Sequence, residues 1–254
     1  MMPQLFEAEL ILPPGERGVQ SMGSLFHGAL MERLPEGLAA FLHTQNLRPY
    51  SQCIYRGRDT GSTLWRIGTL DGAMGQAVQD ALCSMDELFL KQKNYAVSVR
   101  HVRCVRQCSY TEIADECFLS AQAPQRARLS FLSPTSFKRD GAYVILPELL
   151  LIVQSLLVRW NRFSKDVRIE EEGLAQKLAA ACRLTRYALH TAPFSLEGYT
   201  MQGFRGQMSL RFAGTDMVRR ILGTLAAFAP YAGIGIKTAL GMGAVDVDIW
   251  KGQE

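Results

Sequence analysis

The segment from Pro230 to Val247 combines residue types that can bind an anion. It holds four glycines around one lysine and one threonine, and these six residues are Gly233, Gly235, Lys237, Thr238, Gly241 and Gly243. Glycine lets a backbone approach another group closely, and main-chain amides beside a lysine can hold a phosphate. From the residues alone, a glycine-rich turn before a last strand explains the segment equally well. The six residues are therefore candidate RNA- or phosphate-binding positions.

Neither common nucleotide-binding motif fits this segment. A dinucleotide-binding loop runs from a strand through glycines into a helix, which places the phosphate at the helix N-terminus. Here a helical pattern comes first and a strand pattern follows. A Walker loop has glycine directly before Lys-Ser/Thr, whereas Ile236 separates Gly235 from Lys237. The sequence therefore predicts no nucleotide cofactor.

Two histidines lie where a general acid or base could act. His43 ends a short predicted helix, Glu36 to Leu42, and Arg48 follows in the loop before a predicted strand. His27 lies beside the apolar stripe of a predicted helix from Ser21 to Leu34. Histidine titrates near neutral pH, so it suits proton transfer. From the residues alone, however, a solvated histidine that balances the helix dipole is the commoner explanation of His43.

The elements that must position these residues recur in one order. In the first half the patterns run strand, helix, strand, strand, helix, strand, which is the ferredoxin-like βαββαβ order. The second half fits the same order with an insertion, after a mildly polar linker at 119–125. We therefore expect an α+β fold with tandem ferredoxin-like, or RRM-like, domains at 1–118 and 125–254. The glycine-rich segment follows the last predicted helix, so we expect it near the cleft between the domains.

Strand patterns in the second half place arginines on one face. In the predicted strands 126–132 and 203–212, arginines alternate with apolar residues. The candidates for contact with RNA phosphates are Arg126, Arg128 and Arg205 on strands, and Lys138 and Arg139 at a predicted hairpin tip. Most of the other basic residues, Arg159 among them, are expected to be solvated. A one-sided basic face suits RNA backbones.

Composition limits the class of protein without identifying it. The chain has 254 residues, 48% of them hydrophobic, and a formal net charge of +4, which permits but does not require a nucleic-acid partner. None of its six cysteines forms a Cys-x-x-Cys pair, so we expect reduced thiols in the cytoplasm and no metal site. The N-terminus has no basic start or apolar stretch of a signal peptide. The longest apolar run, Leu149–Val153, is too short to span a membrane.

The glycine-rich segment carries a family resemblance. Its order Gly-Ile-Gly-x-Lys-Thr-x-x-Gly-Met-Gly near the end of the chain resembles the terminal signature of the CRISPR repeat-processing endoribonucleases, the Cas-six family of the RAMP superfamily. Three earlier segments resemble that family in the same order, and they are Ser24–Leu30, Leu38–Ser51 and Phe131–Phe137. The resemblance therefore extends over most of the chain. Some family members have a tyrosine one turn after His27, where this chain has Met31.

The resemblance implies a metal-independent endoribonuclease that cleaves CRISPR repeat RNA in the precursor transcript. It implies that His43, His27 and Arg48 are catalytic. One histidine would take the proton of a ribose 2′-hydroxyl, the other would protonate the leaving 5′-oxygen, and the arginine would steady the phosphorane. The products would carry 2′,3′-cyclic phosphate and 5′-hydroxyl ends. Which histidine is the base stays open at this point.

The same resemblance leaves a second function open. A non-catalytic RNA-binding RAMP subunit of a CRISPR effector complex would have the same fold and the same glycine-rich segment. The presence of both His27 and His43 argues against it, because an inactive member would lack the cleft histidine. Other CRISPR effector subunits and a second copy of this chain remain open as partners, and no membrane partner is expected.

Overall fold

The first half of the chain forms a five-stranded antiparallel sheet in the order β2-β3-β1-β5-β4. The computed structural model describes residues 2–57, 61–196 and 198–252. The strands are β1 Gln4–Ile11, β2 Tyr50–Arg56, β3 Thr63–Thr69, β4 Glu87–Leu90 and β5 Tyr95–Gln107. The helices are the 3-10 turn η1 Gln20–Met22, α1 Gly23–Met31, α2 Glu36–Thr44 and α3 Gly72–Cys83.

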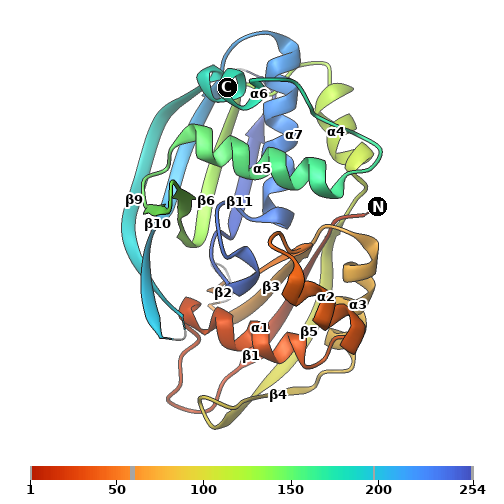
Figure 1. Ribbon diagram of the computed structural model, residues 1–254, viewed down its shortest axis with the longest axis vertical. Helices are drawn as coiled ribbons and strands as arrows, with labels where there is room; N and C mark the ends of the chain where they lie inside the picture. The colour runs from red at the N-terminus through yellow and green to blue at the C-terminus, as the bar shows by residue number, and fades with distance from the viewer. Residues whose placement is uncertain (1, 58–60, 197, 253–254) are drawn as a thin grey trace.

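The second half forms a four-stranded antiparallel sheet in the order β11-β6-β10-β9. Its strands are β6 Arg126–Thr135, β9 Cys182–Leu196, β10 Tyr199–Phe212 and β11 Val245–Trp250, and a hairpin of β7 Phe137–Arg139 and β8 Ala142–Val144 follows β6. Its helices are α5 Leu149–Phe163, α6 Leu174–Ala181, α7 Asp216–Ala232 and the 3-10 turn η2 Thr238–Leu240. With β4 and the hairpin set aside, both halves place their four strands in the fourth-first-third-second order of the ferredoxin-like fold, so the predicted fold class is confirmed (Figure 1).

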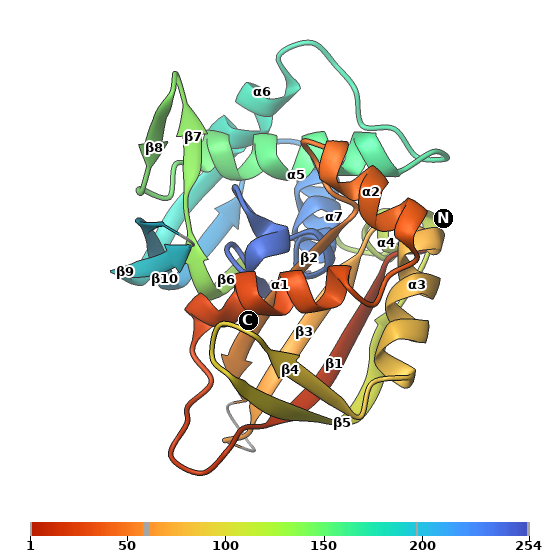
Figure 2. The ribbon, with the colours of Figure 1, turned by 60° about the horizontal axis from the view of Figure 1, so that its bottom comes forward.

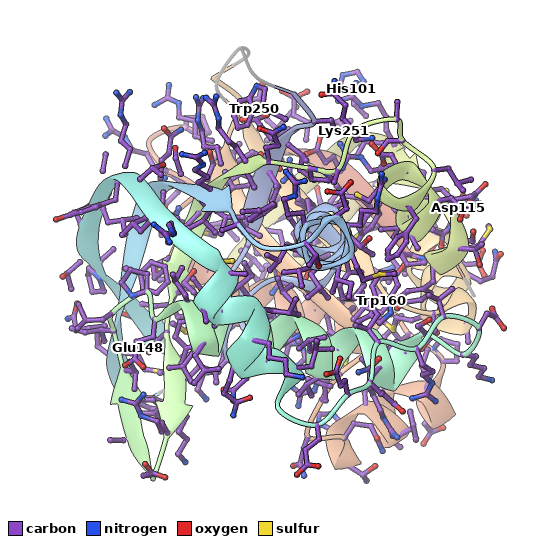
Figure 3. All side chains as sticks on the ribbon, turned by 90° about the horizontal axis from the view of Figure 1, so that it is seen from above. His101, Asp115, Glu148, Trp160, Trp250 and Lys251 are labelled. Atoms are coloured by element: carbon purple, nitrogen blue, oxygen red, sulfur yellow. The ribbon has the colours of Figure 1, made fainter. Side chains whose placement is uncertain are left out.

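Alternating burial explains why the strands in the second half form a sheet with one open face. In β10 the side chains of Phe204, Met208 and Leu210 are buried, while Arg211 between them and the end of the strand is exposed. The buried face packs against α5, α6 and α7. Within this layer Trp160 is fully buried, and Figure 3 shows it in the interior of the molecule, with His101 and Trp250 at the periphery.

The connection between the halves belongs structurally to the second half. α4 (Tyr110–Phe118) starts with a capping box of Ser109 and Glu112. The ring of Tyr110 meets that of Trp160 edge-on at 5.0 Å between centroids. The guanidinium of Arg220 in α7 donates to main-chain oxygens at the end of α4 and just beyond it. The predicted domain limits at 118 and 125 thus fall beside a helix that packs across them, and these limits stay a prediction.

The glycine-rich segment lies between the halves, as predicted. The side-chain amide of Gln52 in β2 donates both to the Gly23 oxygen at 2.6 Å and to the Ala239 oxygen at 3.1 Å. A β-carbon on Gly23 would lie 2.4 Å from the Leu240 oxygen, so only glycine permits this approach. Figure 2 shows the segment after α7 between α1 and α5. The packing therefore fixes the segment against the first helix of the chain.

The clearest differences from the sequence predictions concern α1, α7 and β4. α1 covers Gly23–Met31, which is shorter at both ends than the predicted Ser21–Leu34, because its first residues form the 3-10 turn η1. α7 continues to Ala232, so the start of the glycine-rich segment, Pro230 included, is helical. β4 was not predicted, because its four residues are too few for a periodic pattern to stand out.

Candidate functional site

Four polar side chains gather where α1, α2 and β2 meet. His27 in α1 places Nδ1 2.5 Å from the hydroxyl of Tyr50, the first residue of β2, and the two rings stack with centroids 6.1 Å apart. Arg48 and His43 both lie near enough to His27 to lower its pKa electrostatically. The structure thus brings together the three predicted catalytic residues and adds Tyr50.

The end of α2 determines how His43 and Arg48 are presented. The hydroxyl of Thr44 donates to the Phe41 oxygen at 2.8 Å and closes the last turn. The guanidinium of Arg48 donates from Nε to the Leu42 oxygen at 3.2 Å, so the loop folds back onto the helix end. His43 is exposed on that last turn. The loop therefore holds a fixed arginine next to an exposed histidine.

Burial gives the two histidines different properties. Burial lowers the pKa of His27 to about 4, and the nearby charges of Arg48 and His43 lower it in the same direction. His27 is therefore neutral at pH 7. Burial also raises the pKa of Tyr50, so its hydroxyl keeps its proton. One signal for Tyr50 is readable before folding, its place two residues after Arg48 at the start of a predicted strand, but its contact with His27 depends on the fold.

Most main-chain amides of the glycine-rich segment donate hydrogen bonds to other groups of the protein. The amide of Ile234 donates to the Gly243 oxygen, that of Ile236 to the Ser136 oxygen, and that of Gly243 to the Pro134 oxygen. Gly235 has φ +88°, and a β-carbon there would lie 2.3 Å from the Ser136 oxygen. The predicted close approach of this backbone is thus to other parts of the protein. The four predicted glycines, Gly233, Gly235, Gly241 and Gly243, are all buried.

Lys237 and Thr238 face different surroundings within this segment. The ammonium of Lys237 lies 5.5 Å from the centroid of the Tyr199 ring, which is itself 45% exposed. Thr238 is buried, and its hydroxyl accepts a hydrogen bond from Arg159 at 3.3 Å. Lys237 is therefore the part of the segment that can reach a ligand. The expectation that Arg159 is solvated is wrong, since 94% of its surface is covered because α5 turns it under this segment.

The other predicted RNA-binding residues lie in three places. Arg126 and Arg128 line a groove on the open face of the second sheet, together with Tyr187 and Trp250, and Arg128 lies 5.2 Å from the Trp250 ring centroid. Arg205 lies instead in the cleft between the two sheets. Lys138 and Arg139 are exposed on β7, where Arg139 forms an ion pair with Glu148. The basic residues thus form separate surfaces.

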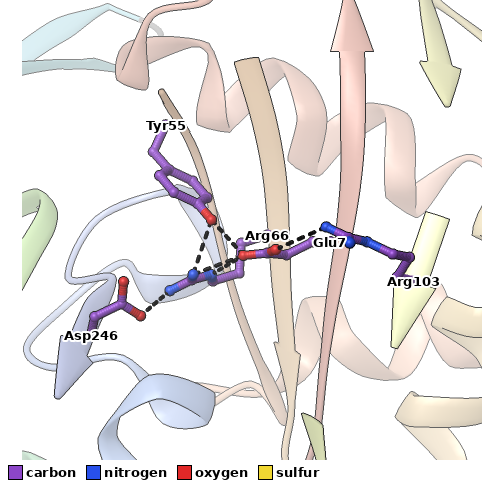
Figure 4. A network of polar contacts seen from close by, with 5 residues as sticks. All are labelled: Glu7, Tyr55, Arg66, Arg103 and Asp246. Atoms are coloured by element: carbon purple, nitrogen blue, oxygen red, sulfur yellow. Dashed lines mark hydrogen bonds and ion pairs between the residues drawn. The ribbon is translucent and has the colours of Figure 1, made fainter. Parts of the chain in front are cut away.

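A network of polar side chains joins the two sheets at the cleft (Figure 4). Arg66 in β3 forms an ion pair with Glu7 at 2.7 Å and another with Asp246 of β11, across the two halves. Tyr55 donates to Glu7, and Arg103 lies 4.0 Å from the same carboxylate. Burial raises the pKa of Glu7, but the Tyr55 hydrogen bond and the Arg66 charge outweigh it, so the net pKa is lowered. Sequence analysis missed this network, because its members are far apart in the chain.

Within the described ranges, no group of three or more His, Cys, Asp or Glu side chains is arranged to hold a metal ion. No helix in those ranges is long and apolar enough to cross a membrane.

Comparison with known proteins gives one consistent family. The family model for "CRISPR-associated endoribonuclease Cas6" matches residues 129–245. A protein of that description from Mycobacterium tuberculosis is 30% identical over 237 residues, which cover 92% of this chain and 74% of the relative. One from Streptococcus thermophilus is 29% identical over 229 residues, with 90% and 92% covered. A solved Cas6 product complex has the same fold, with TM-score 0.80 at 24% identity and with 98% and 100% covered.

Proposed function

The chain belongs to the family of CRISPR-associated endoribonucleases Cas6, and from this premise we propose that it cleaves CRISPR repeat RNA within the precursor transcript. The observation that supports this most is the convergence of His27, His43 and Arg48 with Tyr50 at one end of α2. Proton-transfer groups beside a fixed arginine are what cleavage by a ribose 2′-hydroxyl requires. The cytoplasm, where the transcript is made, is the proposed location.

The hydrogen bond between Tyr50 and His27 assigns their protons. Tyr50 is buried, and among the described residues His27 is the partner that its hydroxyl contacts. If His27 donated from Nδ1, the buried Tyr50 proton would lack an acceptor, which costs about 1–3 kcal/mol. Tyr50 therefore donates to Nδ1, and His27 carries its proton on Nε2. In this tautomer His27 is a hydrogen-bond donor through Nε2 and has no free lone pair to act as a base.

These proton positions divide the catalytic work. His43, exposed on the last turn of α2, takes the proton of the 2′-hydroxyl as that oxygen attacks the adjacent phosphorus. His27 donates from Nε2 to a phosphoryl oxygen, and Arg48 supplies positive charge as the phosphorane forms. The bond from phosphorus to the 5′-oxygen breaks, and this oxygen takes a proton from water. The products are a 2′,3′-cyclic phosphate and a 5′-hydroxyl, and no step needs a metal ion.

The rest of the proposed site binds the RNA. Lys237 contacts a phosphate next to the cleavage site, while Gly233, Gly235, Gly241 and Gly243 shape the backbone that presents it. Thr238 holds that backbone from inside. Further basic residues contact phosphates farther along the strand, and these are Arg126, Arg128, Lys138, Arg139 and Arg205. The proposed site therefore draws on both halves of the chain. Other effector subunits and a second copy of the chain stay open as partners.

A cleavage assay tests this function. Repeat RNA labelled at its 5′ end is incubated with excess protein in EDTA, and the product ends are analysed. We expect one cut in the repeat, with a 3′ end that resists phosphatase until acid opens the cyclic phosphate. RNA that is bound but stays intact would instead identify a non-catalytic RNA-binding subunit. Cleavage that EDTA abolishes would contradict the metal-independent chemistry.

A further inference from the structure

Arg159 is a buried cation directly beneath the glycine-rich segment. It projects from α5, and its guanidinium makes four hydrogen bonds. Nη2 donates to the Gly235 oxygen at 2.8 Å and to the Thr238 hydroxyl at 3.3 Å. Nη1 donates to the Ser155 hydroxyl at 2.8 Å and to the Ser155 main-chain oxygen at 3.2 Å. All four acceptors are neutral.

Ser155 and Arg159 together grip the main chain of one residue of the segment, Gly235. The amide of Gly235 donates to the Ser155 hydroxyl at 2.8 Å, while the oxygen of the same residue accepts from Arg159. The two side chains are four residues apart, so they lie on the same face of α5. Gly235 has a backbone conformation that other residues rarely adopt. The grip therefore holds a segment that sequence propensity alone would leave free.

The charge of Arg159 has no counterion within the described part of the chain. Burial is the sole cause that lowers its pKa, to about 10, so the side chain remains protonated at pH 7. An unpaired buried charge is costly in free energy. Arg66 shows the contrast, because this largely buried guanidinium is paired with Glu7 and Asp246. A buried cation without a counterion next to Lys237 favours the binding of an anion from outside the protein.

We propose that Arg159 is a positioning residue for RNA: it holds the glycine-rich segment in shape with Ser155, and its unneutralised charge attracts the phosphate that binds at Lys237. This inference rests on the proposed function. The Nη1 and Nη2 donors of Arg159 are used by the segment and by Ser155, so we assign its effect on the phosphate to its charge. The charge of Arg159, beneath the glycine-rich segment, therefore increases the affinity for RNA through a preorganised electrostatic field.

Two substitutions at this position separate charge from hydrogen bonding. Arg159→Gln keeps a donor for the Gly235 oxygen but removes the charge, whereas Arg159→Lys keeps the charge. Affinity for repeat RNA is measured against salt concentration, with thermal unfolding to verify folding. We expect Arg159→Gln to bind about tenfold more weakly, which is 1.4 kcal/mol, and Arg159→Lys to stay within about threefold of the original. Ser155→Ala tests the grip alone and should weaken binding about threefold.

The salt dependence distinguishes this role from direct phosphate contact. Removing a contacting lysine lowers the log–log slope by about 0.7 for single-stranded RNA. We expect that change for Lys237→Ala, and a smaller one for Arg159→Gln. If Arg159→Gln folds and binds as tightly as the original chain, the charge has no role. If Ser155→Ala binds as tightly as the original chain, the grip has no role in RNA binding. This variant tests the grip even where Arg159→Gln fails to fold. Failure of the proposed function differs, because the unmodified chain would then leave repeat RNA intact, whether or not it binds it.

Discussion

The two halves bury a basic side chain at comparable places, with opposite results. Each lies in the helical connection between the first and second strands of a ferredoxin-like order, His27 in α1 and Arg159 in α5. Burial lowers the pKa of both, of His27 to about 4 and of Arg159 to about 10. Because histidine starts near 6.5 and arginine above 12, His27 is neutral at pH 7 and Arg159 stays charged. The same physical effect thus produces a hydrogen-bond donor in one half and a phosphate-attracting charge in the other.

This difference gives the two halves separate proposed roles. In the first half a neutral His27, an exposed His43 and Arg48 are suited to chemistry on a phosphate. In the second half Arg159 stands behind Lys237, which is suited to holding a phosphate. We expect variants of the first half to change the cleavage rate and variants of the second half to change the affinity for RNA.

Removal of His43 should have the largest effect among the variants that test the separate roles of the two halves. We expect His43→Ala to lower the single-turnover cleavage rate by about 10² to 10⁴, the usual worth of one positioned acid or base. RNA affinity should change little, because phosphate binding is assigned to the second half in the proposed function. His101→Ala is the matched control, since this exposed histidine lies in β5 at the periphery of the molecule. An undiminished rate in His43→Ala would place the proton-transfer group elsewhere.

Acid stability sharpens the contrast between His27 and Arg159. Between pH 6.5 and 4 the unfolded chain protonates His27 but the folded chain does not. Its contribution to stability is therefore complete above pH 6.5 and is lost as the pH falls towards 4, by up to about 3 kcal/mol. Arg159 is protonated in both states over this range and contributes no slope.

Urea unfolding at pH 7 and pH 4.5 measures this effect. The carboxylates titrate in every variant, so a comparison with His27→Asn isolates the histidine. The variant should lose less stability than the original chain on acidification. Equal losses in both chains would show that His27 titrates normally when folded.

The tautomer of His27 offers the next test. Tyr50→Phe removes the hydroxyl that holds Nδ1 and leaves the ring in place, so the imidazole can lose its fixed proton position. We expect cleavage about tenfold slower, a new ionisation in the pH–rate profile, and RNA affinity unchanged. A slower rate with an unaltered profile would indicate a packing role for Tyr50 and no effect on the proton.

The smallest expected effect belongs to the surface of the glycine-rich segment. Lys237→Ala should weaken RNA binding several-fold and lower the salt slope by about 0.7, while the rate at saturating protein stays close to the original. Lys177→Ala is a fair control, because this exposed lysine of α6 pairs with Glu171. If Lys237→Ala changed the rate but not the affinity, the proposed division between the halves would be wrong.

The sequence was sufficient to predict the fold and the family, but only part of the site. Alternating strands, the repeated element order and the glycine-rich segment carry local or nearly local signals, so they predicted the sheets and the place of the segment. β4 was not predicted, because its four residues are too few to show a periodic pattern.

The site depends on contacts between distant residues, which periodicity does not reveal. Tyr50 contacts His27 across 23 residues, and Arg159 reaches Gly235 across 76. Arg159 was grouped with the basic residues expected to be mostly solvated, whereas α5 buries it. Its role emerges only when α5 and the loop after α7 are placed together.

The central claim is that a ribose 2′-hydroxyl attacks its own phosphate under the control of the histidines. The most direct measurement uses repeat RNA with a single 2′-deoxy nucleotide on the 5′ side of the cut, compared with unmodified RNA in EDTA. We expect the deoxy RNA to bind with unchanged affinity and to remain uncleaved. Cleavage of that RNA, or a 3′-hydroxyl end on the product of the unmodified RNA, would contradict it.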